Sequence, residues 1–532
     1  MVKNTLQLCL LWEPLSSLVD RLGAFASTAL LLVISWSLSV IFWPTERPNA
    51  PVAGYRSMFE PSFLLKARFI RNANKIIGDA YKTMRDRPFV VRRYDLDFVV
   101  LPVKYLEEIR LISYKKLSSR GAQVGNLVPD WNGLDGVVNS NLHVEAVRRH
   151  LNPDLYKYVD YGYNELAHGW ADEVPRTDDW SLTNIEEVMR RLMARITAKI
   201  FMGDTASRDP SWINISVGFS VDLFESSFGI KMFPPWTYPF IVWLIPARYR
   251  VRRQLAATRQ MVDKLLQRLN DAQARRRQGE TIDEEDTLLN WMVENGKPWE
   301  NTVPQMAARL CVLAMASIHT TAATLANVVY ELCAHPEWIP VLQEEIDTIA
   351  QDLGKPDDNL ASEGSTSKQW CERLEKLDSF IMESQRHNPV MILNPQRLAT
   401  EPIMLSGGVY IPAGTRLAFA NHEHHMDPRT HPDPAVFDPL RSYRKRHAAA
   451  DQRHLHLADQ THPSALSFGY GNQACAGRHF AVAVMKLIMA RMLYEFDFRF
   501  PEGQGMPENR YVDENVYKDL GARVEMKRRA RG

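Results

Sequence analysis

Near its C-terminal end the chain reads Phe468-Gly469-Tyr470-Gly471-Asn472-Gln473-Ala474-Cys475-Ala476-Gly477-Arg478. Apolar residues at helical spacing follow at once, which predicts that the cysteine lies in a tight loop leading into a helix N-terminus. The free N–H groups and partial positive charge of a helix N-terminus favour the thiolate, the metal-binding form of cysteine. A loop of this composition suits a haem iron held by one axial sulfur.

Two other interpretations fit this stretch when it is taken alone. A lone cysteine is usually a small core residue, and Gly469-x-Gly471-x-x-Ala474 loosely matches a dinucleotide-binding fingerprint. That fingerprint follows a Val/Ile-rich strand, whereas residues 462–467 have the composition of a loop. The choice among the three interpretations therefore depends on the rest of the chain.

Length and composition set the broad class. The chain has 532 residues, of which 45% are hydrophobic, enough for a large core. Its formal net charge of +1 gives no indication of nucleic-acid binding. The five cysteines are widely scattered and contain no CxxC pair, so we expect a reducing compartment without a disulfide framework. They are Cys9, Cys311, Cys333, Cys371 and Cys475.

The N-terminal segment, residues 1–44, is predicted to carry a membrane anchor. Residues 22–43 contain no charged side chain, and about 20 apolar residues span the core of a bilayer. Trp43-Pro44 follows in place of the small-residue cleavage site of a secretory signal, which favours an uncleaved anchor. Residues 45–54 are rich in proline and are predicted to form a stiff linker, with residues 55–532 as one domain.

The rest of the chain has the patterns of a mainly α protein with small β-sheets. Residues 89–91 and 98–101 are predicted strands, and residues 404–411 a hairpin with a Gly-Gly turn. Residues 354–368 are predicted to form an exposed loop. The predicted helices, besides a longer one described next, cover 105–112, 144–170, 185–201, 248–278 and 374–386.

A helix over residues 303–334 begins at a capping-box sequence and ends at His335-Pro336, long enough to cross the whole core. It contains Ala316-Ser317-Ile318-His319-Thr320-Thr321. Hydroxyls beside an imidazole are able to pass protons to a ligand. The alternative is structural: threonines that bond to helix carbonyls, with the histidine on a polar face.

Glu383 and Arg386 are spaced i,i+3, on one face of a predicted helix. Such a pair on the surface contributes little. The segment Phe437-x-Pro439-x-Arg441 offers a second arginine, however, and a glutamate between two arginines would form a bidentate structural clamp.

Two further segments have open interpretations. Residues 422–425 read His-Glu-His-His, which suggests zinc but misses H-E-x-x-H because Met426 takes the last position, so a loop histidine cluster is favoured. Residues 233–246 are aromatic, broken by proline and too short to span a bilayer. They form either a loop dipping into a membrane surface or a buried connection.

Taken in this order, the four motifs resemble the cytochrome P450 superfamily: residues 316–321, Glu383-x-x-Arg386, residues 437–441 and the cysteine loop. The variant Ile318-His319-Thr320-Thr321 is similar to fungal microsomal enzymes that oxidise terpenoids and related secondary metabolites. The resemblance implies the cytochrome P450 fold and haem b with Cys475 as its metal ligand. It also implies three groups of site residues: Thr320, His319 and Thr321 for catalysis; Arg397, Phe468, Gly471, Gln473 and Gly477 around the haem; and Glu383, Arg386 and Arg441 as the clamp.

The chain departs from the family pattern at several positions. His319 stands where the family usually has an acid, and Ser317 where it usually has a glycine. Gln473 replaces a frequent Arg or His, which would turn a salt bridge with a haem propionate into a neutral hydrogen bond. The usual Trp-x-x-x-Arg is missing, and either Arg148 or Arg149 would take the place of its arginine.

The resemblance implies a membrane-anchored haem-thiolate monooxygenase that oxidises a lipophilic small molecule. It would take electrons from NADPH through NADPH-cytochrome P450 reductase, and its catalytic domain would face the cytosol from the endoplasmic reticulum. One alternative is a haem-thiolate isomerase or dehydratase that needs no reductase. Another is a non-catalytic haem-binding membrane protein.

Overall fold

The structure is a computed structural model that describes residues 48–282, 284–356 and 366–530. Helices predominate and the sheets are small, so the predicted mainly α class is confirmed. The helices are α2 (Ser62–Met84), α3 (Leu106–Leu111), α4 (Ser119–Gly125), α5 (Pro129–Asn132), α6 (Asp135–Asn139), α7 (Leu142–Ala146), α8 (Leu155–Glu173), α9 (Ile185–Met202), α10 (Asp204–Ser207), α11 (Pro210–Lys231), α12 (Tyr238–Ile241), α13 (Pro246–Arg277), α14 (Leu288–Asn295), α15 (Val303–Ala334), α16 (Trp338–Leu353), α17 (Thr366–Arg373), α18 (Glu375–His387), α19 (Asn421–His425), α20 (Arg441–His447) and α21 (Arg478–Glu495).

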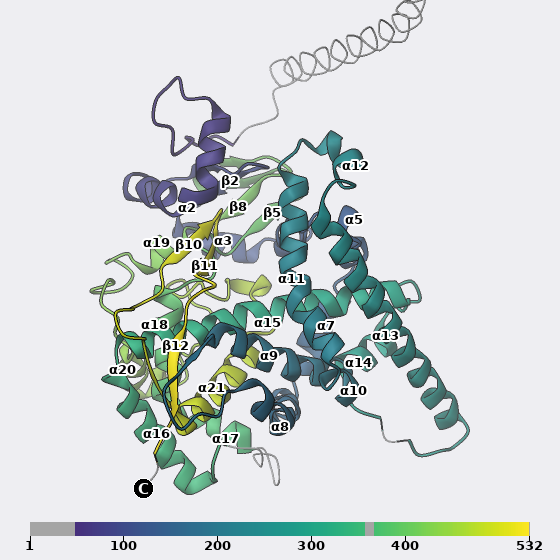
Figure 1. Ribbon diagram of the computed structural model, residues 1–532. Helices are drawn as coiled ribbons and strands as arrows, with labels where there is room; N and C mark the ends of the chain where they lie inside the picture. The colour runs from purple at the N-terminus through teal and green to yellow at the C-terminus, as the bar shows by residue number, and fades with distance from the viewer. Residues whose placement is uncertain (1–47, 283, 357–365, 531–532) are drawn as a thin grey trace, which may run out of the picture.

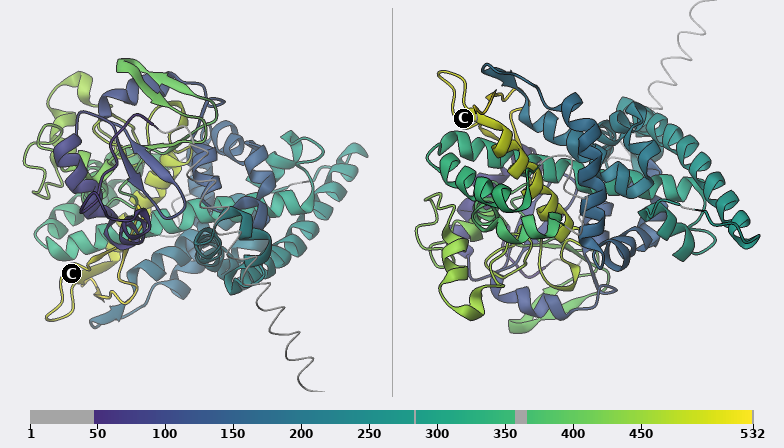
Figure 2. Two further views of the ribbon diagram at one scale, coloured as in Figure 1. Left: turned by 90° about the horizontal axis from the view of Figure 1, so that it is seen from above. Right: turned by 90° about the horizontal axis from the view of Figure 1, so that it is seen from below.

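Helix α15 has the predicted bounds and is the central element of the fold. Figures 1 and 2 show it running through the middle of the molecule, where it packs against α9, α11, α13, α18 and α21. By length and composition it could cross a membrane, but 61% of its most apolar window is buried inside the protein. Its apolar length therefore reflects its place in the core.

The sheets form small layers around this helical body. Their strands are β1 (Phe89–Arg92), β2 (Asp97–Val100), β3 (Leu117–Ser118), β4 (Ser181–Thr183), β5 (Arg397–Ala399), β6 (Ile403–Leu405), β7 (Val409–Ile411), β8 (Arg416–Ala418), β9 (Phe496–Arg499), β10 (Asn509–Val512), β11 (Asn515–Lys518) and β12 (Val524–Arg528). The largest sheet has the order β1-β2-β8-β5-β3, in which β2 and β8 are parallel. The predicted hairpin is β6–β7, and its turn requires glycine because Gly407 and Gly408 have φ of 71° and 78°.

Part of the predicted linker belongs to the folded body. Val52 forms a parallel bridge with Val90, the Ala53 N–H donates to the Val90 carbonyl (2.8 Å), and the Val90 N–H donates to the Pro51 carbonyl (2.8 Å). The chain is thus paired to β1 before residue 55, where the domain was predicted to begin. The predicted anchor, residues 22–43, lies outside the described residues.

Two other predictions need correction. The helix expected over 144–170 is interrupted: α7 is followed by a π-helical turn, Val147–Leu151, and α8 starts only after Pro153, which cannot donate a helical hydrogen bond. The loop expected over 354–368 ends earlier, because α17 begins at Thr366 and Ser367 is fully buried.

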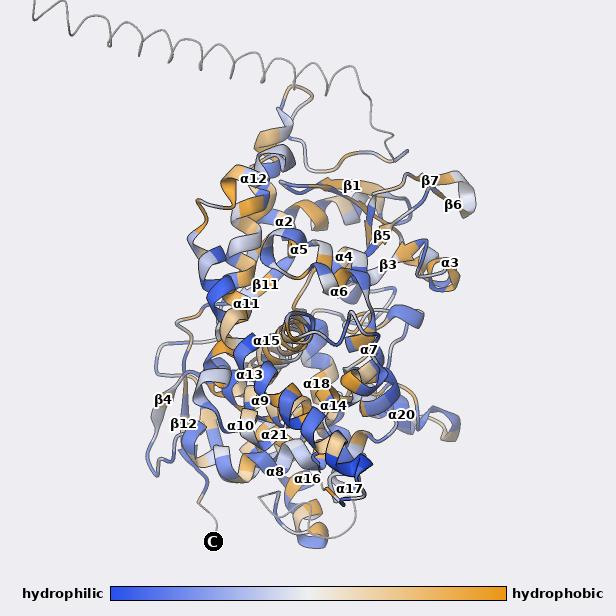
Figure 3. Ribbon diagram, turned by 90° about the vertical axis from the view of Figure 1, so that its right-hand side faces the viewer, coloured by the Kyte–Doolittle hydropathy of each residue, from blue (hydrophilic) through white to orange (hydrophobic). Residues whose placement is uncertain are grey.

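Most of the segment 233–246 is exposed and only Val242 within it is fully buried, so its interpretation as a buried connection is wrong. Phe240 and Leu244 are 71% and 74% exposed, and Trp236 and Trp243 are each 57% exposed. The segment that leads into α2 is also apolar, and it lies with α12 at one end of the molecule (Figures 1 and 3). This end therefore presents aromatic side chains to the surroundings.

Candidate functional site

The cysteine lies in a tight loop directly before α21, as predicted. The Cys475 N–H donates to the Phe468 carbonyl (2.9 Å) and closes the loop. Gly469 and Gly471 have φ of 76° and 71°, and a Cβ at Gly471 would lie only 2.5 Å from Cγ of Arg110. Both glycines are required by the backbone, because L side chains disfavour that conformation.

The thiol of Cys475 is surrounded by protein and is still accessible to solvent. Burial raises its pKa, while the N–H groups of Gly477 and Arg478 donate to the sulfur and lower the pKa. The guanidinium groups of Arg478 and Arg148 also lower it. The sulfur is therefore accessible beside N–H and guanidinium donors, and this donor set favours a bound thiolate.

Neither the backbone conformation nor the packing of the protein requires a glycine at position 477. Its φ is an ordinary −89°, and a Cβ built on it would meet no heavy atom within 4 Å. Phe468, at the other end of the loop, is half-buried and packs against the main hydrophobic core. Open space over Gly477 at one end of the loop and an apolar ring at the other end fit a flat macrocycle lying against the loop.

Arg397 is a buried cation without an acidic partner among the described residues. Its guanidinium donates to the carbonyls of Gln396 (2.8 Å) and Tyr470 (3.1 Å). Burial lowers its pKa to about 10, and it forms no ion pair in the described part of the chain. Because a buried charge is normally paired, this arginine fits an acidic group supplied by a ligand, such as a haem propionate.

The structure distinguishes Arg148 from Arg149. Arg148 donates to the carbonyl of Asn472 in the cysteine loop (3.0 Å). Arg149 lies 3.7 Å from Glu145, and its side chain is 70% exposed. Arg148 is therefore the arginine directed at the cysteine loop.

Gln473 has protein partners that the sequence did not predict. Its Nε2 donates to the Leu117 carbonyl (2.7 Å), and its Oε1 accepts from the Ser119 N–H (2.7 Å). The amide therefore ties the cysteine loop to β3 and the start of α4, while its hydrogen bond to a haem propionate stays a prediction.

Within α15, the two adjacent threonines face different surroundings. Ala316 and Thr320 are exposed in the middle of an otherwise buried helix, whereas Thr321 is 5% exposed. The Thr320 hydroxyl donates to the Ala316 carbonyl (2.8 Å), which leaves its oxygen lone pairs free to accept. Of the two threonines, Thr320 is therefore the one open to a ligand, and a catalytic role for the buried Thr321 stays a prediction.

His319 is held by a neighbouring helix. Its Nε2 lies 2.9 Å from the Val217 carbonyl in α11, and since a carbonyl only accepts, Nε2 carries the proton. Burial, with help from nearby Arg190, lowers the pKa of His319 to about 4. At neutral pH the ring is uncharged and links α15 to α11.

The predicted clamp is assembled as a buried network. Arg386 makes a bidentate pair with Glu383 through Nε (2.9 Å) and Nη2 (2.7 Å), and Nε of Arg441 lies 3.4 Å from the same carboxylate. The Asp438 N–H also donates to Glu383 (2.9 Å). Arg386 further donates to the Pro434 carbonyl (2.7 Å), so the network fixes the segment before α20.

The histidines of residues 422–425 are not a loop cluster. They form the short helix α19, in which His424 and His425 are buried. Within the described ranges, no group of His, Cys, Asp or Glu is arranged to hold a metal ion. Sequence reasoning missed that these rings hold backbone groups of residues 463–466, and no local pattern signalled it.

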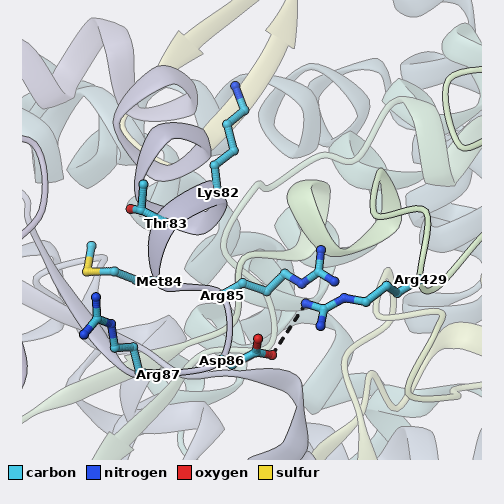
Figure 4. Close-up of a pocket in the computed structure, with 7 residues that line it drawn as sticks. All are labelled: Lys82, Thr83, Met84, Arg85, Asp86, Arg87 and Arg429. Atoms are coloured by element: carbon cyan, nitrogen blue, oxygen red, sulfur yellow. Dashed lines mark hydrogen bonds and ion pairs between the residues drawn. The ribbon is translucent and has the colours of Figure 1, made fainter.

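A basic pocket of about 480 Å³ lies at the end of α2 (Figure 4). Its lining includes Arg85, which pairs with Asp427 (3.1 Å), and Arg429, which lies 3.5 Å from Asp86. None of the site residues discussed above lines it, and acidic neighbours compensate these two arginines. We assign it no part in the chemistry.

Comparisons with known proteins agree on one family. Residues 104–516 match the family model for cytochrome P450. The chain is 39% identical to cytochrome P450 monooxygenase ATR4 of Stachybotrys chlorohalonatus, covering 93% of this chain and 94% of that one. It is 32% identical to ent-kaurene oxidase P450-4 of Gibberella fujikuroi, covering 96% of each. The crystal structure of a cytochrome P450, CYP102L1, has the same fold, with a TM-score of 0.64, 18% identity and coverage of 91% of this chain and 100% of the other.

Proposed function

We propose a function from one premise: the chain belongs to the cytochrome P450 family and is a monooxygenase of the fungal secondary-metabolite type. We infer that it oxidises a lipophilic, terpenoid-like small molecule with O2 and electrons from NADPH delivered by NADPH-cytochrome P450 reductase. The relative named for ent-kaurene oxidation supports this substrate class. The haem, when bound, supplies the activation of dioxygen.

The observation that carries the proposal is the environment of Cys475. Its accessible sulfur, the two N–H groups of Gly477 and Arg478, and the open space over Gly477 suit a thiolate that would hold a haem iron. Arg397, which is buried and has no acidic partner among the described residues, would hold one propionate, and Phe468 would pack against the ring. Gly471 and Gln473 would shape the loop without touching the iron.

Thr320 is the residue we assign to proton delivery. Its oxygen is exposed within α15 and retains acceptor capacity, so it is able to hold a proton-bearing water or ligand hydroxyl. His319 is neutral, and its Nε2–H is committed to Val217, so we assign it to holding α11 against α15.

Thr320→Ala is expected to lower product formation about 10²-fold, because general acid–base groups contribute about 10²- to 10⁴-fold. NADPH consumption should fall less than product formation, since electrons from NADPH would reduce dioxygen without oxidising the substrate. The measurement is the ratio of product formed to NADPH consumed. Thr348→Ala is the control, because Thr348 makes the same bond to a helix carbonyl (2.8 Å, to Glu344) in α16. An unchanged ratio in Thr320→Ala would remove Thr320 from the account.

We place the catalytic domain at the membrane of the endoplasmic reticulum through the predicted anchor and the exposed aromatic segment 233–246. Trp236 and Trp243 are each 57% exposed at the end of the molecule that carries α12. Aromatic side chains of this kind favour the bilayer interface.

Brominated phospholipids are therefore expected to quench the fluorescence of Trp236 and Trp243 in the full-length protein bound to vesicles, measured in a background in which Trp36 and Trp43 of the predicted anchor are already phenylalanine. In that background, replacing Trp236 and Trp243 with phenylalanine should remove most of the quenching, because phenylalanine keeps the apolar contact and loses the signal. Trp180 is the control, since it directly precedes β4, which lies far from α12 in Figure 3. If the quenching disappears in Trp180→Phe instead, the region around Trp180 and not the end with α12 would lie at the membrane, which would contradict this placement.

The test of the proposed function is the reduced, carbon-monoxide-bound spectrum of the purified protein, followed by turnover with terpenoid substrates. A thiolate-type band and turnover that requires both reductase and NADPH are the expected results. Turnover without the reductase would indicate the isomerase or dehydratase alternative. A thiolate band without turnover or any substrate-induced spectral shift would favour the non-catalytic haem-binding protein.

A further inference from the structure

Three buried histidines hold the segment that leads into the cysteine loop. Nε2 of His424 lies 2.7 Å from the Pro463 carbonyl, and Nε2 of His431 lies 3.1 Å from the Ser464 carbonyl. Nε2 of His425 lies 3.1 Å from the backbone nitrogen of Leu466. The three rings therefore fix residues 463–466 from one side.

His425 differs from the other two in the direction of its hydrogen bond. An amide N–H only donates, so Nε2 of His425 accepts through its lone pair. The ring is 1% exposed, and burial keeps the pKa of His425 well below its ordinary value, so that lone pair is available at neutral pH. His424 and His431 face carbonyls and must donate.

The backbone of His425 is held by the clamp. Nη1 of Arg386 donates to the His425 carbonyl (3.0 Å), while the same guanidinium pairs with Glu383. His425 thus contacts the clamp through its backbone carbonyl, and its ring contacts the segment before the cysteine loop.

Leu466 is in turn connected to the loop by backbone hydrogen bonds. Its carbonyl accepts from Nδ2 of Asn394 (2.5 Å) and from the Gly469 N–H (2.9 Å). Two residues after Leu466, the Phe468 carbonyl accepts from the Cys475 N–H. A displacement of Leu466 would therefore shift the sulfur of Cys475.

We propose that His425 is a positioning residue for Cys475, which transmits the fixed geometry of the Glu383–Arg386 pair to the cysteine loop through the Leu466 N–H. This inference rests on the proposed function, in which Cys475 is the axial ligand. It assigns to the clamp an effect on the position of the metal ligand, through His425 and Leu466, in addition to its effect on stability.

The test compares His425→Leu with His425→Gln in the full-length holoprotein. Leucine removes the acceptor, whereas the glutamine Oε1 is able to take the place of Nε2. Hydrogen exchange of the Leu466 amide should accelerate about ten-fold or more in His425→Leu and stay close to wild type in His425→Gln. The carbon monoxide spectrum of His425→Leu should shift from the thiolate-type band towards the thiol-type band, and that of His425→Gln should not.

His422→Leu is the matched control, because His422 lies in the same helix and its buried Nδ1 has no hydrogen-bond partner within the described part of the chain. It should change neither Leu466 exchange nor the spectrum. If His425→Leu does not accumulate as holoprotein, His425→Asn replaces it, since its shorter amide does not reach Leu466 and the same two changes are expected.

The outcomes separate this inference from the proposed function. A wild-type protein without a thiolate band would overturn the proposed function, whatever the variants show. A wild-type band that persists in His425→Leu or His425→Asn, with unchanged Leu466 exchange, would overturn the inference alone. Loss of the band in His425→Gln or in His422→Leu to the same extent as in His425→Leu would also overturn the inference. The missing acceptor at Nε2 would then not be the cause of the spectral change.

Discussion

Cys475→Ala is expected to abolish the thiolate-type carbon monoxide band and to reduce monooxygenase activity to background. Alanine has no atom able to bind iron, and the N–H groups of Gly477 and Arg478 would lose their acceptor. Because the ligand bond would anchor the haem, haem content per polypeptide should fall as well. Absorbance spectra of the reduced protein and haem quantification on purified protein measure both effects.

Cys371→Ala is the control for this prediction. Cys371 is 4% exposed in the main hydrophobic core, and its thiol lies 3.7 Å from the Ala483 carbonyl in α21. Its replacement removes a cysteine that packs against the same helix without touching the loop, so the thiolate band should persist. A thiolate band that survives in Cys475→Ala would mean that another residue binds the iron.

Glu383→Gln is expected to cost about 3–5 kcal/mol, because removal of one member of a buried ion pair leaves an uncompensated charge. Glu383 and Arg386 have side chains that are 4% and 5% exposed, and Arg441 would also lose its partner. The variant should lose haem at lower temperature and unfold at lower denaturant concentration. Glu372→Gln is the control, because Glu372 is 60% exposed and 3.9 Å from Lys368, a surface pair worth about 0–1 kcal/mol.

The same variant has a defined pH dependence. Arg386 and His387 hold the pKa of Glu383 far below its ordinary value of 4.5, against the opposing effect of burial. A carboxylate with a lowered pKa stabilises the fold fully above pH 4.5, and that contribution is lost as the pH falls through the lowered pKa. The stability difference between wild type and Glu383→Gln should therefore be constant above pH 4.5 and shrink in more acidic solution. A difference that grows as the pH falls would contradict the clamp.

The elements predicted best are those whose signals are local. The helix at residues 303–334 has both predicted bounds, because the apolar run and His335-Pro336 lie in the sequence itself. The expected capping box is not formed, since Thr302 makes no side-chain cap hydrogen bond and Gln305 accepts from Arg309 instead. The β6–β7 hairpin was predicted for the same reason, since its turn needs two glycines at positive φ. Helix 144–170 was overextended because the π-helical turn before Pro153 has no equally clear local signature.

The parts of the site that escaped prediction depend on distant partners. Thr320 and Thr321 look equivalent in the sequence, and only packing around α15 exposes one and buries the other. Gln473 bonds to Leu117 and Ser119, more than 350 positions away. The polar residues around His425 are typical of an exposed segment, yet His425 is buried between the clamp and Leu466. Motif spacing identified the cysteine loop and the clamp, whereas the connection between them required the fold.

X-ray absorption at the iron edge of the purified holoprotein tests the central claim most directly, because it reports the atoms bound to the metal. We expect one sulfur in the first coordination shell of the wild-type protein and none in Cys475→Ser. A first shell without sulfur in wild type, or one that keeps its sulfur in Cys475→Ser, would contradict the assignment of Cys475 as the haem ligand.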